Sequence, residues 1–499
     1  MISSVLVLMS AVLFGQPEIV PKPVRAEFQL GTCVPLAADL PFRVCVEDES
    51  ARAAAVSWVT AHAKAVFGVN LGDVSAPPPA GPASMADEAY ELTVGTNGVT
   101  ILAKNLAGVR HGFGTLRQMA LPQRGTLKVE GWIAPAGKVV DRPRMSFRGI
   151  HLCWFPETKV TTIERCIRLA AYYRMNTVVL ETWGTFRSER YPWWGWAEGT
   201  MTKAEIHRLK AIADDLGVTL VPQFNIYGHA SMSRSRSAKH AVIDRHPEYQ
   251  TLYEPSGWNW CLTNPEALKV IDGLVVEMHE AFGNPPYFHI GCDEAEAQSC
   301  PTCRTHDNTE LVAAHITRVA RILEGRGARA MMWHDMLLKK GEWKPFYANA
   351  TRGEEKMLGR LPKSVVICDW FYGLAQTNGY PTLTHFRQAG YDVVTSPWEN
   401  EKGTLAQGKA AAEAGALGIL GTTWHHVYKF AISRQFVPCA AAGWGTAPGA
   451  VSPRTGAAWA GTWGSTTTTT AASSPNRCRG RRTPRSIRAA ERTDDDGKT

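Results

Sequence analysis

The stretch YFHIGCDE, residues 287–294, decides the fold of this chain. Its first four residues suit a buried β-strand, and a glycine, a cysteine and two adjacent acids follow them. A short apolar run of this kind, ended by a glycine, is typical of a strand of a parallel sheet that is covered on both faces. The two acids, Asp293 and Glu294, therefore stand where a strand ends and a loop begins.

Similar apolar runs recur on both sides of this stretch, with amphipathic helical segments between them. Strands alternating with helices predict a parallel sheet covered by helices. The sequence predicts eight strands in all, which is the number that closes a (β/α)8 barrel. An open doubly wound sheet is the alternative, because hydrophobic patterning alone does not prove closure. The predicted strands span 147–154, 176–182, 218–224, 287–293, 328–334, 364–370, 391–398 and 417–424.

A smaller domain is predicted ahead of the barrel. Residues 89–105 form two alternating segments around Thr96-Asn97-Gly98, where Asn-Gly supplies the positive φ of a tight hairpin turn. Residues 106–121 then have helical spacing. The predicted fold class is therefore α/β, a TIM barrel over residues 143–437 preceded by a small α+β domain over residues 19–142.

Both ends of the chain differ from the body in composition. The apolar stretch from Val5 to Gly15 has the length of a signal-peptide core, so residues 1–18 are predicted to be a signal peptide and the protein to be exported, either periplasmic or secreted. A buried N-terminal strand or a misplaced start is the alternative. Residues 438–499 are rich in Ala, Gly, Thr and Arg, and predict a disordered tail or a shifted reading frame that damages the eighth helix of the barrel.

Composition and charge exclude several classes of partner. The chain is 44% hydrophobic and 20% charged, which is typical of a globular protein, and no later apolar run reaches the roughly 20 residues that cross a bilayer. The net charge is +8, and half of it comes from the residues after Asn476, which hold eight Lys/Arg against four Asp/Glu. The folded body therefore has no predicted basic face, and neither nucleic acid nor a membrane is a predicted partner.

Asp293 and Glu294 are the strongest candidates for chemistry. Active-site groups of a parallel barrel lie where strands end, because side chains from several strands converge there. Two close carboxylates do not both ionise cheaply, so one of them acts as an acid near neutral pH, as glycoside hydrolysis requires. A solvated acidic loop and a divalent-metal site with hard oxygen ligands are the alternatives.

Tryptophans mark the ends of the later strands. They stand at or near the ends of the fifth to eighth strands, and one more, Trp183, follows the second. Indole rings stack on the apolar faces of sugar rings, so tryptophans brought together at one end of a barrel predict a carbohydrate pocket. The four residues are Trp333, Trp370, Trp398 and Trp424.

Four segments together resemble a known family. They are FHIGCDEA (288–295), MMWHDM (331–336), FNIYGHAS (224–231) and the hairpin and helix that precede the barrel. Over residues 85–430 the chain resembles glycoside hydrolase family 20, the β-N-acetylhexosaminidases. The resemblance implies an amino-sugar glycan as substrate, no cofactor, and a retaining mechanism in which the 2-acetamido group of the substrate is the nucleophile.

The resemblance also implies roles for individual residues. Glu294 is expected to be the general acid and later the base, and Asp293 to bind the acetamido N–H. Arg148 and His229 are expected to bind the sugar, and Trp333 to line the acetamido pocket. Tyr372, in CDWFYG, is the candidate for the tyrosine that hydrogen-bonds the acetamido carbonyl.

Some positions depart from the family pattern. The Asp-x-x-Arg continuation is missing after the first strand, where His151-Leu152-Cys153-Trp154 stand instead, and the second strand ends in Glu181. Trp424 is followed by two histidines rather than by a glutamate one residue further on. Together with the unusual tail, these departures keep a carbohydrate-binding barrel without turnover open as an alternative. A metal-dependent barrel enzyme is the other alternative, because of the two acids at a strand end.

A compact set of metal-binding residue types follows the acids. It consists of Cys292, Cys300, Cys303 and His306, and contains one Cys-x-x-Cys. Structural zinc needs four converging ligands, so this pattern leaves zinc, free thiols and a local disulfide open.

Overall fold

The computed structural model of the chain describes residues 17–71, 74–76, 85–125, 128–182, 184–196, 199–231, 242–374, 379–424 and 432–445. Residues 1–16 of the predicted signal peptide, Trp183, the two histidines after Trp424 and the tail from residue 446 lie outside these ranges. In the described part of the chain, no helix combines the length and the apolar content needed to cross a bilayer.

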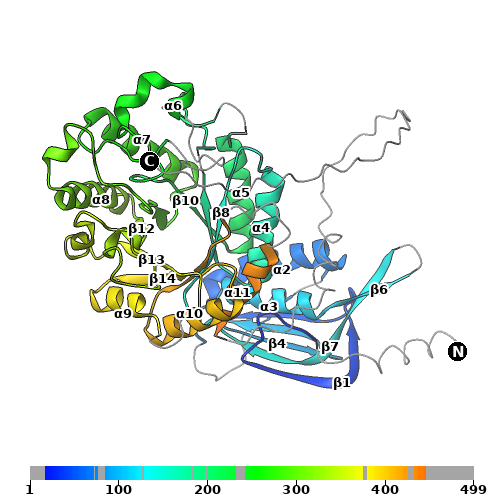
Figure 1. Ribbon diagram of the computed structural model, residues 1–499. Helices are drawn as coiled ribbons and strands as arrows, with labels where there is room; N and C mark the ends of the chain where they lie inside the picture. The colour runs from blue at the N-terminus through cyan, green and yellow to red at the C-terminus, as the bar shows by residue number, and fades with distance from the viewer. Residues whose placement is uncertain are drawn as a thin grey trace, which may run out of the picture. The chain divides into compact units, whose positions relative to one another are not determined.

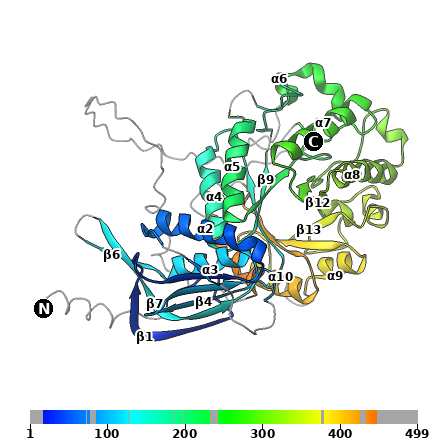
Figure 2. The same ribbon diagram turned by 180° about the vertical axis from the view of Figure 1, so that it is seen from behind.

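The N-terminal domain is a sheet with two helices on one face (Figures 1 and 2). Its hairpin, β4 (Tyr90–Gly95) and β5 (Gly98–Ala103), pairs as the sequence predicts, and Gly98 takes a φ of 127°. The sheet order is β1-β7-β4-β5-β2-β3, with β6 paired to β7. The other elements are β1 (Arg25–Pro35), β2 (Phe42–Val46), α2 (Glu49–Phe67), β3 (Ser75–Ala76), α3 (Leu106–Met119), β6 (Leu121–Arg124) and β7 (Val129–Asp141).

The second domain is a closed barrel of parallel strands, so the predicted TIM barrel is confirmed and the open sheet is excluded. Each of the eight predicted strands is present, and the last pairs with the first, with Ile419 opposite Arg148. The strands are β8 (Phe147–Cys153), β9 (Thr177–Glu181), β10 (Thr219–Gln223), β11 (Tyr287–His289), β12 (Arg329–Trp333), β13 (Val366–Trp370), β14 (Asp392–Ser396) and β15 (Gly418–Gly421).

Helices surround the barrel, and several begin at a recognisable cap (Figure 1). At α7, the Asn264 side chain accepts a hydrogen bond from the N–H of Glu266, and Pro265 occupies the first turn, where its missing N–H costs nothing. The helices are α4 (Val160–Tyr172), α5 (Lys203–Leu216), α6 (Val242–Arg245), α7 (Pro265–Ala281), α8 (Asn308–Glu324), α9 (Pro381–Gln388), α10 (Glu401–Glu413) and α11 (Ile432–Trp444), with 3-10 turns η1 (Pro247–Leu252), η2 (Cys303–Thr305), η3 (Asp335–Leu337) and η4 (Glu354–Gly359).

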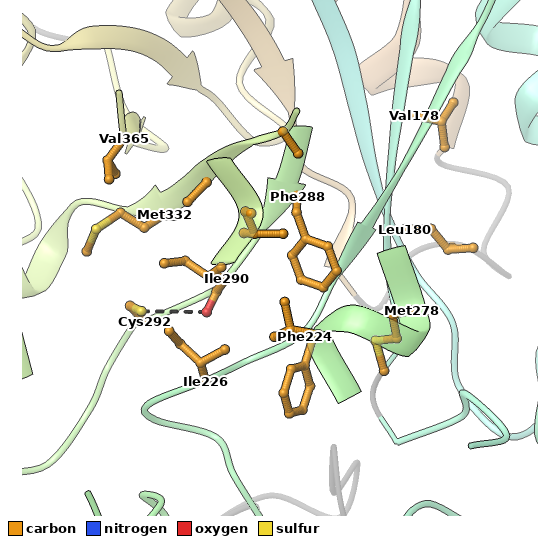
Figure 3. Packing of buried hydrophobic residues seen from close by; sticks show 14 of the residues in the cluster. Val178, Leu180, Phe224, Ile226, Met278, Phe288, Ile290, Cys292, Met332 and Val365 are labelled. Carbon is orange, nitrogen blue, oxygen red and sulfur yellow. Dashed lines mark hydrogen bonds between the residues drawn. The ribbon is translucent and has the colours of Figure 1, made fainter. Parts of the chain in front are cut away.

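Alternate residues of each strand build two separate cores, because successive side chains of a strand point to opposite faces. Met331 and Trp333 pack inside the barrel, whereas Met332 packs in the layer between the strands and the helices. Figure 3 shows this outer layer, in which Phe288 of β11 lies near Met278 of α7. The barrel interior is therefore filled with side chains, and only its ends are free to bind a ligand.

The predicted start of a disordered or aberrant tail at residue 438 is wrong for residues 438–444. These residues complete α11, which packs against α10, β15 and β8, so a helix does follow the eighth strand. The segment looks featureless because its small residues are buried on several sides instead of forming a single apolar stripe. At Gly408, for example, a β-carbon would lie 2.4 Å from the Cβ of Ala442. Close helix packing, rather than periodicity, explains the composition.

Candidate active site

The backbone after β11 turns sharply and brings neighbouring side chains to different places. Gly291, Cys292 and Glu294 have φ values of 69°, 73° and 47°. A β-carbon at Gly291 would lie 1.8 Å from the Oδ1 of Asn225, so only glycine fits there. Cys292 points into the outer apolar layer, where its Sγ donates to the carbonyl of Ile290 at 3.5 Å (Figure 3).

The same turn places both acids beside His229. The Nε2 of His229 lies 3.2 Å from a carboxylate oxygen of Asp293 and 3.4 Å from one of Glu294. The Asp293 side chain is buried, whereas that of Glu294 is 54% exposed. Gly228 allows the two loops to touch, since a β-carbon there would lie 2.7 Å from the carbonyl oxygen of Asp293. The carboxylate of Asp293 is thus enclosed, whereas that of Glu294 is accessible to solvent.

Trp258, in the connection between β10 and α7, contacts both His229 and Glu294. Its ring lies 4.2 Å from that of His229, and its indole N–H donates to the carbonyl oxygen of Glu294 at 2.8 Å. Sequence reasoning missed this residue because it stands far along a long connection and not at a strand end. The sequence marks Trp258 only by the motif Trp258-Asn259-Trp260, which has no fixed spacing to a strand.

Asp335, at the start of η3, is a second residue that sequence reasoning missed. Its buried carboxylate accepts hydrogen bonds from the N–H of Glu294 at 2.9 Å, from the Asn349 amide at 2.8 Å and from the Trp370 indole at 3.3 Å. Burial and the nearby charge of Asp293 raise the pKa of Asp335 to about 6. The signal was the acid two residues after β12, in MMWHDM.

The predicted aromatic residues lie together at the carboxyl ends of β12 to β15. Trp333 and Trp370 are the last residues of β12 and β13 and are buried, whereas Trp398 and Trp424 follow β14 and β15 and are half-buried. The Trp333 and Trp424 rings are 5.6 Å apart.

Tyr372 packs against the aromatic wall that Trp333, Trp370, Trp398 and Trp424 form. Its ring lies 5.2 Å from that of Trp370 and 5.1 Å from that of Trp398. Burial raises the pKa of Tyr372 well above its usual value, and the charges of Asp293 and Glu294 add to the effect. A pocket of about 540 Å³ opens beside Tyr372 and Trp398, a volume within the usual range for small ligands.

Polar groups are also buried at the ends of β8 and β9. The Nε2 of His151 lies 3.3 Å from a carboxylate oxygen of Glu181, and the Asn225 amide donates to the other oxygen at 2.9 Å. The His151 ring lies 4.9 Å from that of Trp424 and 5.5 Å from that of Trp333. The positions that depart from the family pattern thus form a polar cluster against the aromatic wall.

The predicted sugar-binding role of Arg148 is wrong. Arg148 is the second residue of β8, so its side chain lies at the amino end of the barrel, opposite to the acids. It is fully buried and donates to both carboxylate oxygens of Glu88, at 2.9 and 2.7 Å. It also donates to the carbonyls of Arg174 and Met145. An arginine with its N–H groups committed in this way connects the barrel to the N-terminal domain.

A closed barrel with paired acids and an aromatic wall at the carboxyl ends of its strands has the architecture of a glycoside hydrolase. The sequence model described as "Glycosyl hydrolase family 20, catalytic domain" matches residues 179–472, which is more than half of the chain. The model described as "Glycosyl hydrolase family 20, domain 2" matches residues 16–142. The chain belongs to glycosyl hydrolase family 20.

Individual relatives are distant. A β-hexosaminidase of Akkermansia muciniphila is 24% identical over 294 residues, which cover 50% of this chain and 56% of that protein. A lacto-N-biosidase of Bifidobacterium bifidum is 27% identical over 221 residues, which cover 42% of this chain and 18% of that protein. The crystal structure of an exo-β-N-acetylglucosaminidase of Vibrio harveyi, in complex with N-acetylglucosamine, aligns with a TM-score of 0.66 at 19% identity, covering 90% of this chain and 77% of that one. At this identity the structure supports the fold alone.

Proposed function

We propose that this protein is an exo-acting β-N-acetylhexosaminidase that removes terminal GlcNAc or GalNAc from a glycan. The observation that carries the proposal is the pair of adjacent carboxylates, one buried and one exposed, both within 3.4 Å of the His229 Nε2. An enclosed carboxylate suits a fixed contact with the substrate, whereas an exposed one suits proton exchange with the leaving group and with water.

The proposed first step uses the acetamido group of the substrate. Asp293 accepts a hydrogen bond from the acetamido N–H and so aims the carbonyl oxygen at the anomeric carbon. That oxygen forms a bond to the anomeric carbon while the glycosidic C–O bond breaks, and Glu294 gives its proton to the leaving oxygen. The charge of Asp293 stabilises the resulting oxazolinium intermediate.

In the proposed second step the oxazolinium ring formed in the first step opens. Glu294, now ionised, takes a proton from a water molecule, which attacks the anomeric carbon and breaks the bond to the acetamido oxygen. Two displacements retain the β configuration. The backbone of Glu294 is fixed on both sides, by Asp335 at its N–H and by Trp258 at its carbonyl, so only its side chain has to move between the two steps.

The aromatic wall is proposed to hold the sugar. Trp333, Trp370, Trp398 and Trp424 offer faces and edges for the pyranose ring and its acetamido methyl group. Tyr372 is proposed to donate to the acetamido carbonyl. The charges of both acids act on its hydroxyl and favour the protonated form, which is the form that donates. With Arg148 at the other end of the barrel, the His151–Glu181 pair is the proposed partner for sugar hydroxyls.

Aryl glycosides test the proposal directly. The purified protein should hydrolyse chromogenic aryl N-acetyl-β-glucosaminide or N-acetyl-β-galactosaminide, and an N-acetyl-thiazoline should inhibit it. Glu294→Gln should lose most of this activity, least with aryl groups that leave without protonation, whereas Glu296→Gln in the same loop should keep it. Absence of both hydrolysis and calorimetrically measured thiazoline binding would remove the substrate-assisted mechanism.

Two alternatives have a specific basis. A sugar-binding barrel without turnover is favoured by the absence of Arg148 from the pocket, and calorimetry showing hexosamine binding without hydrolysis would select it. A metal-dependent enzyme is favoured by His229, Asp293 and Glu294, whose ligand atoms lie within 4.8 Å of one another. Rapid loss of turnover in a chelator, restored by a divalent ion, would select the latter.

A further inference from the structure

Three cysteines from two loops meet beside the candidate active site. The Sγ of Cys261, in the loop between β10 and α7, lies 3.7 Å from the Sγ of Cys300 and 3.7 Å from that of Cys303. Cys300 and Cys303 belong to the loop that carries Asp293 and Glu294. Glu254 is the fourth residue of this group, and one ligand atom from each of the four residues lies within 4.8 Å of the others. The sequence pattern contained only half of this cluster, because Cys261 lies far from the Cys-x-x-Cys in the chain.

The sulfur spacing fits a shared ion better than it fits a disulfide. A disulfide bond is about 2.05 Å long, much shorter than either measured distance. Zinc binds thiolates at about 2.3 Å, and two ligands at tetrahedral corners are then about 3.8 Å apart. The two sulfur distances therefore match the edges of a zinc–thiolate tetrahedron.

Glu254 supplies an independent observation. Its side chain is 1% exposed, and its Oε2 accepts hydrogen bonds from the N–H groups of Ser299 and Cys300, both at 2.6 Å. The Oε1 of the same carboxylate is buried and accepts no N–H or O–H hydrogen bond from the residues that the structure describes, and the thiol of Cys303 is the group that faces the carboxylate. A thiol is a weak donor for a buried carboxylate, and a cation bound among the three sulfurs would satisfy the carboxylate and the thiolates together.

The groups around the sulfurs suit thiolates. The N–H of Cys303 donates to the Sγ of Cys300 at 3.2 Å, and the hydroxyl of Thr263 lies 3.2 Å from the Sγ of Cys303. Donors directed at ligand sulfurs hold them in place and stabilise their charge when a metal is bound. A cleft lined in part by Tyr253, Cys261 and Cys300 gives a path from the surface.

We propose that Glu254, Cys261, Cys300 and Cys303 bind a structural zinc ion. Three thiolates and one carboxylate make a closed tetrahedral set that leaves no position for a substrate, as structural zinc sites require. Cys292 is not part of the site, because its side chain lies in the apolar layer outside β11 (Figure 3). His306 is not in the cluster either.

The position of the site gives the metal a role in shaping the active site. It joins the loop that carries Trp258 to the loop that carries Asp293 and Glu294, and Trp258 already holds the carbonyl of Glu294. Zinc would fix these two loops relative to each other without touching the sugar. Because the site contains no residue of the proposed catalytic pair, it stands whether or not the proposed function is correct.

Metal content and cobalt substitution test the site in the full-length protein. The protein purified with zinc present should hold one equivalent, and replacement by Co²⁺ should produce an intense thiolate-to-cobalt absorption in the near ultraviolet. Cobalt bound instead at His229, Asp293 and Glu294 would lack this absorption, since no sulfur is present there. Asp293→Asn should therefore keep the band.

Variants locate the ligands. Cys261→Ser and Cys303→Ser should lose the zinc equivalent and the cobalt band, and Glu254→Gln should weaken zinc binding at least about tenfold. Cys33→Ser, a half-buried cysteine of the N-terminal domain, is the matched control and should retain both.

Three results would overturn the proposal, and two of them need only the wild-type protein. They are the absence of zinc and of a cobalt band, a disulfide between two of the three cysteines in a non-reducing peptide map, and full zinc content in a folded Cys261→Ser variant. If Cys261→Ser does not fold, Glu254→Gln and the wild-type spectrum still decide the question.

Discussion

The two ends of the barrel use buried charge in opposite ways. At the amino end, Arg148 and Arg174 pair with Glu88 and Asp141 of the N-terminal domain at 2.7 and 2.9 Å. Burial alone would raise the pKa of Glu88, but hydrogen bonds from His111 and Arg148 hold it well below its usual value. At the carboxyl end, burial and the charge of Asp293 raise the pKa of Asp335. Opposite charges connect two domains, whereas like charges close together favour the protonated form of one carboxyl group.

The contrast teaches that position along a strand decides what a charged residue does. Arg148 begins β8, and Asp335 follows β12. Both are fully buried and hydrogen-bonded. Only the second lies at the carboxyl ends of the strands, where its carboxylate accepts a hydrogen bond from the backbone of Glu294. The predictions below test this difference, from the largest expected effect to the smallest.

Breaking the amino-end pair should mainly affect stability. Arg148→Met leaves Glu88 with only the 3.4 Å contact to His111 in a largely buried place and should cost about 3–5 kcal/mol of unfolding free energy, as measured by urea denaturation. Arg168→Met, which breaks a half-buried i,i+4 pair with Glu164 but leaves Glu164 paired with Arg208, should cost about 1 kcal/mol or less. Unchanged stability with a large rise in KM in Arg148→Met would restore the sugar-binding role to this residue.

Removing the enclosed charge at the carboxyl end should mainly affect rate. Asp293→Asn should lower kcat about 10²- to 10³-fold on aryl N-acetylhexosaminides, because the intermediate loses its stabilising charge. Stability should stay the same or rise, since the repulsion of Asp335 disappears. The preference for a 2-acetamido over a 2-hydroxy aryl glycoside should also fall, and an unchanged preference would argue against contact with the acetamido N–H.

Asp335 should make stability depend on pH. Its folded-state pKa of about 6 lies above that of an unfolded aspartate, so between about pH 4 and 6 the folded state binds more protons than the unfolded state. Stability contributed by this proton is present at low pH and is lost as the pH rises through 6, by on the order of 2 kcal/mol. Asp335→Asn should flatten this decline in urea unfolding measured from pH 4 to 7. An equally steep decline in the variant would assign it to another group.

The smallest effect is expected at Trp258. Trp258→Phe keeps a ring against His229 but loses the hydrogen bond to the carbonyl of Glu294, worth about 1 kcal/mol, so kcat should fall about fivefold. Trp132→Phe in the N-terminal domain is the control and should not change kcat. A KM effect without a kcat effect would mean that Trp258 contacts the sugar instead of positioning the acid.

The sequence by itself determined the eight parallel strands and the paired acids, because both depend on local patterns, whereas closure of the barrel came from the structure. Apolar runs such as the one that Gly291 ends mark strands, and the end of a strand in a parallel barrel is where a site forms. Asp293 and Glu294 come directly after such a strand end in the chain. The same local logic failed at residues 438–444, where an Ala-rich helix has no periodic stripe because it is buried on several sides.

Only the tertiary structure decided which distant residues meet. Arg148 pairs with Glu88 across a domain boundary, Asp335 holds the backbone of Glu294, and Cys261 joins Cys300 although 39 positions separate them. Contacts of this kind depend on how loops from different strands approach each other, and no periodicity in the chain encodes that approach. Periodic burial is a local property of a sequence, whereas the pairing of buried charges and sulfurs is set by the closure of the barrel and the docking of its neighbouring domain.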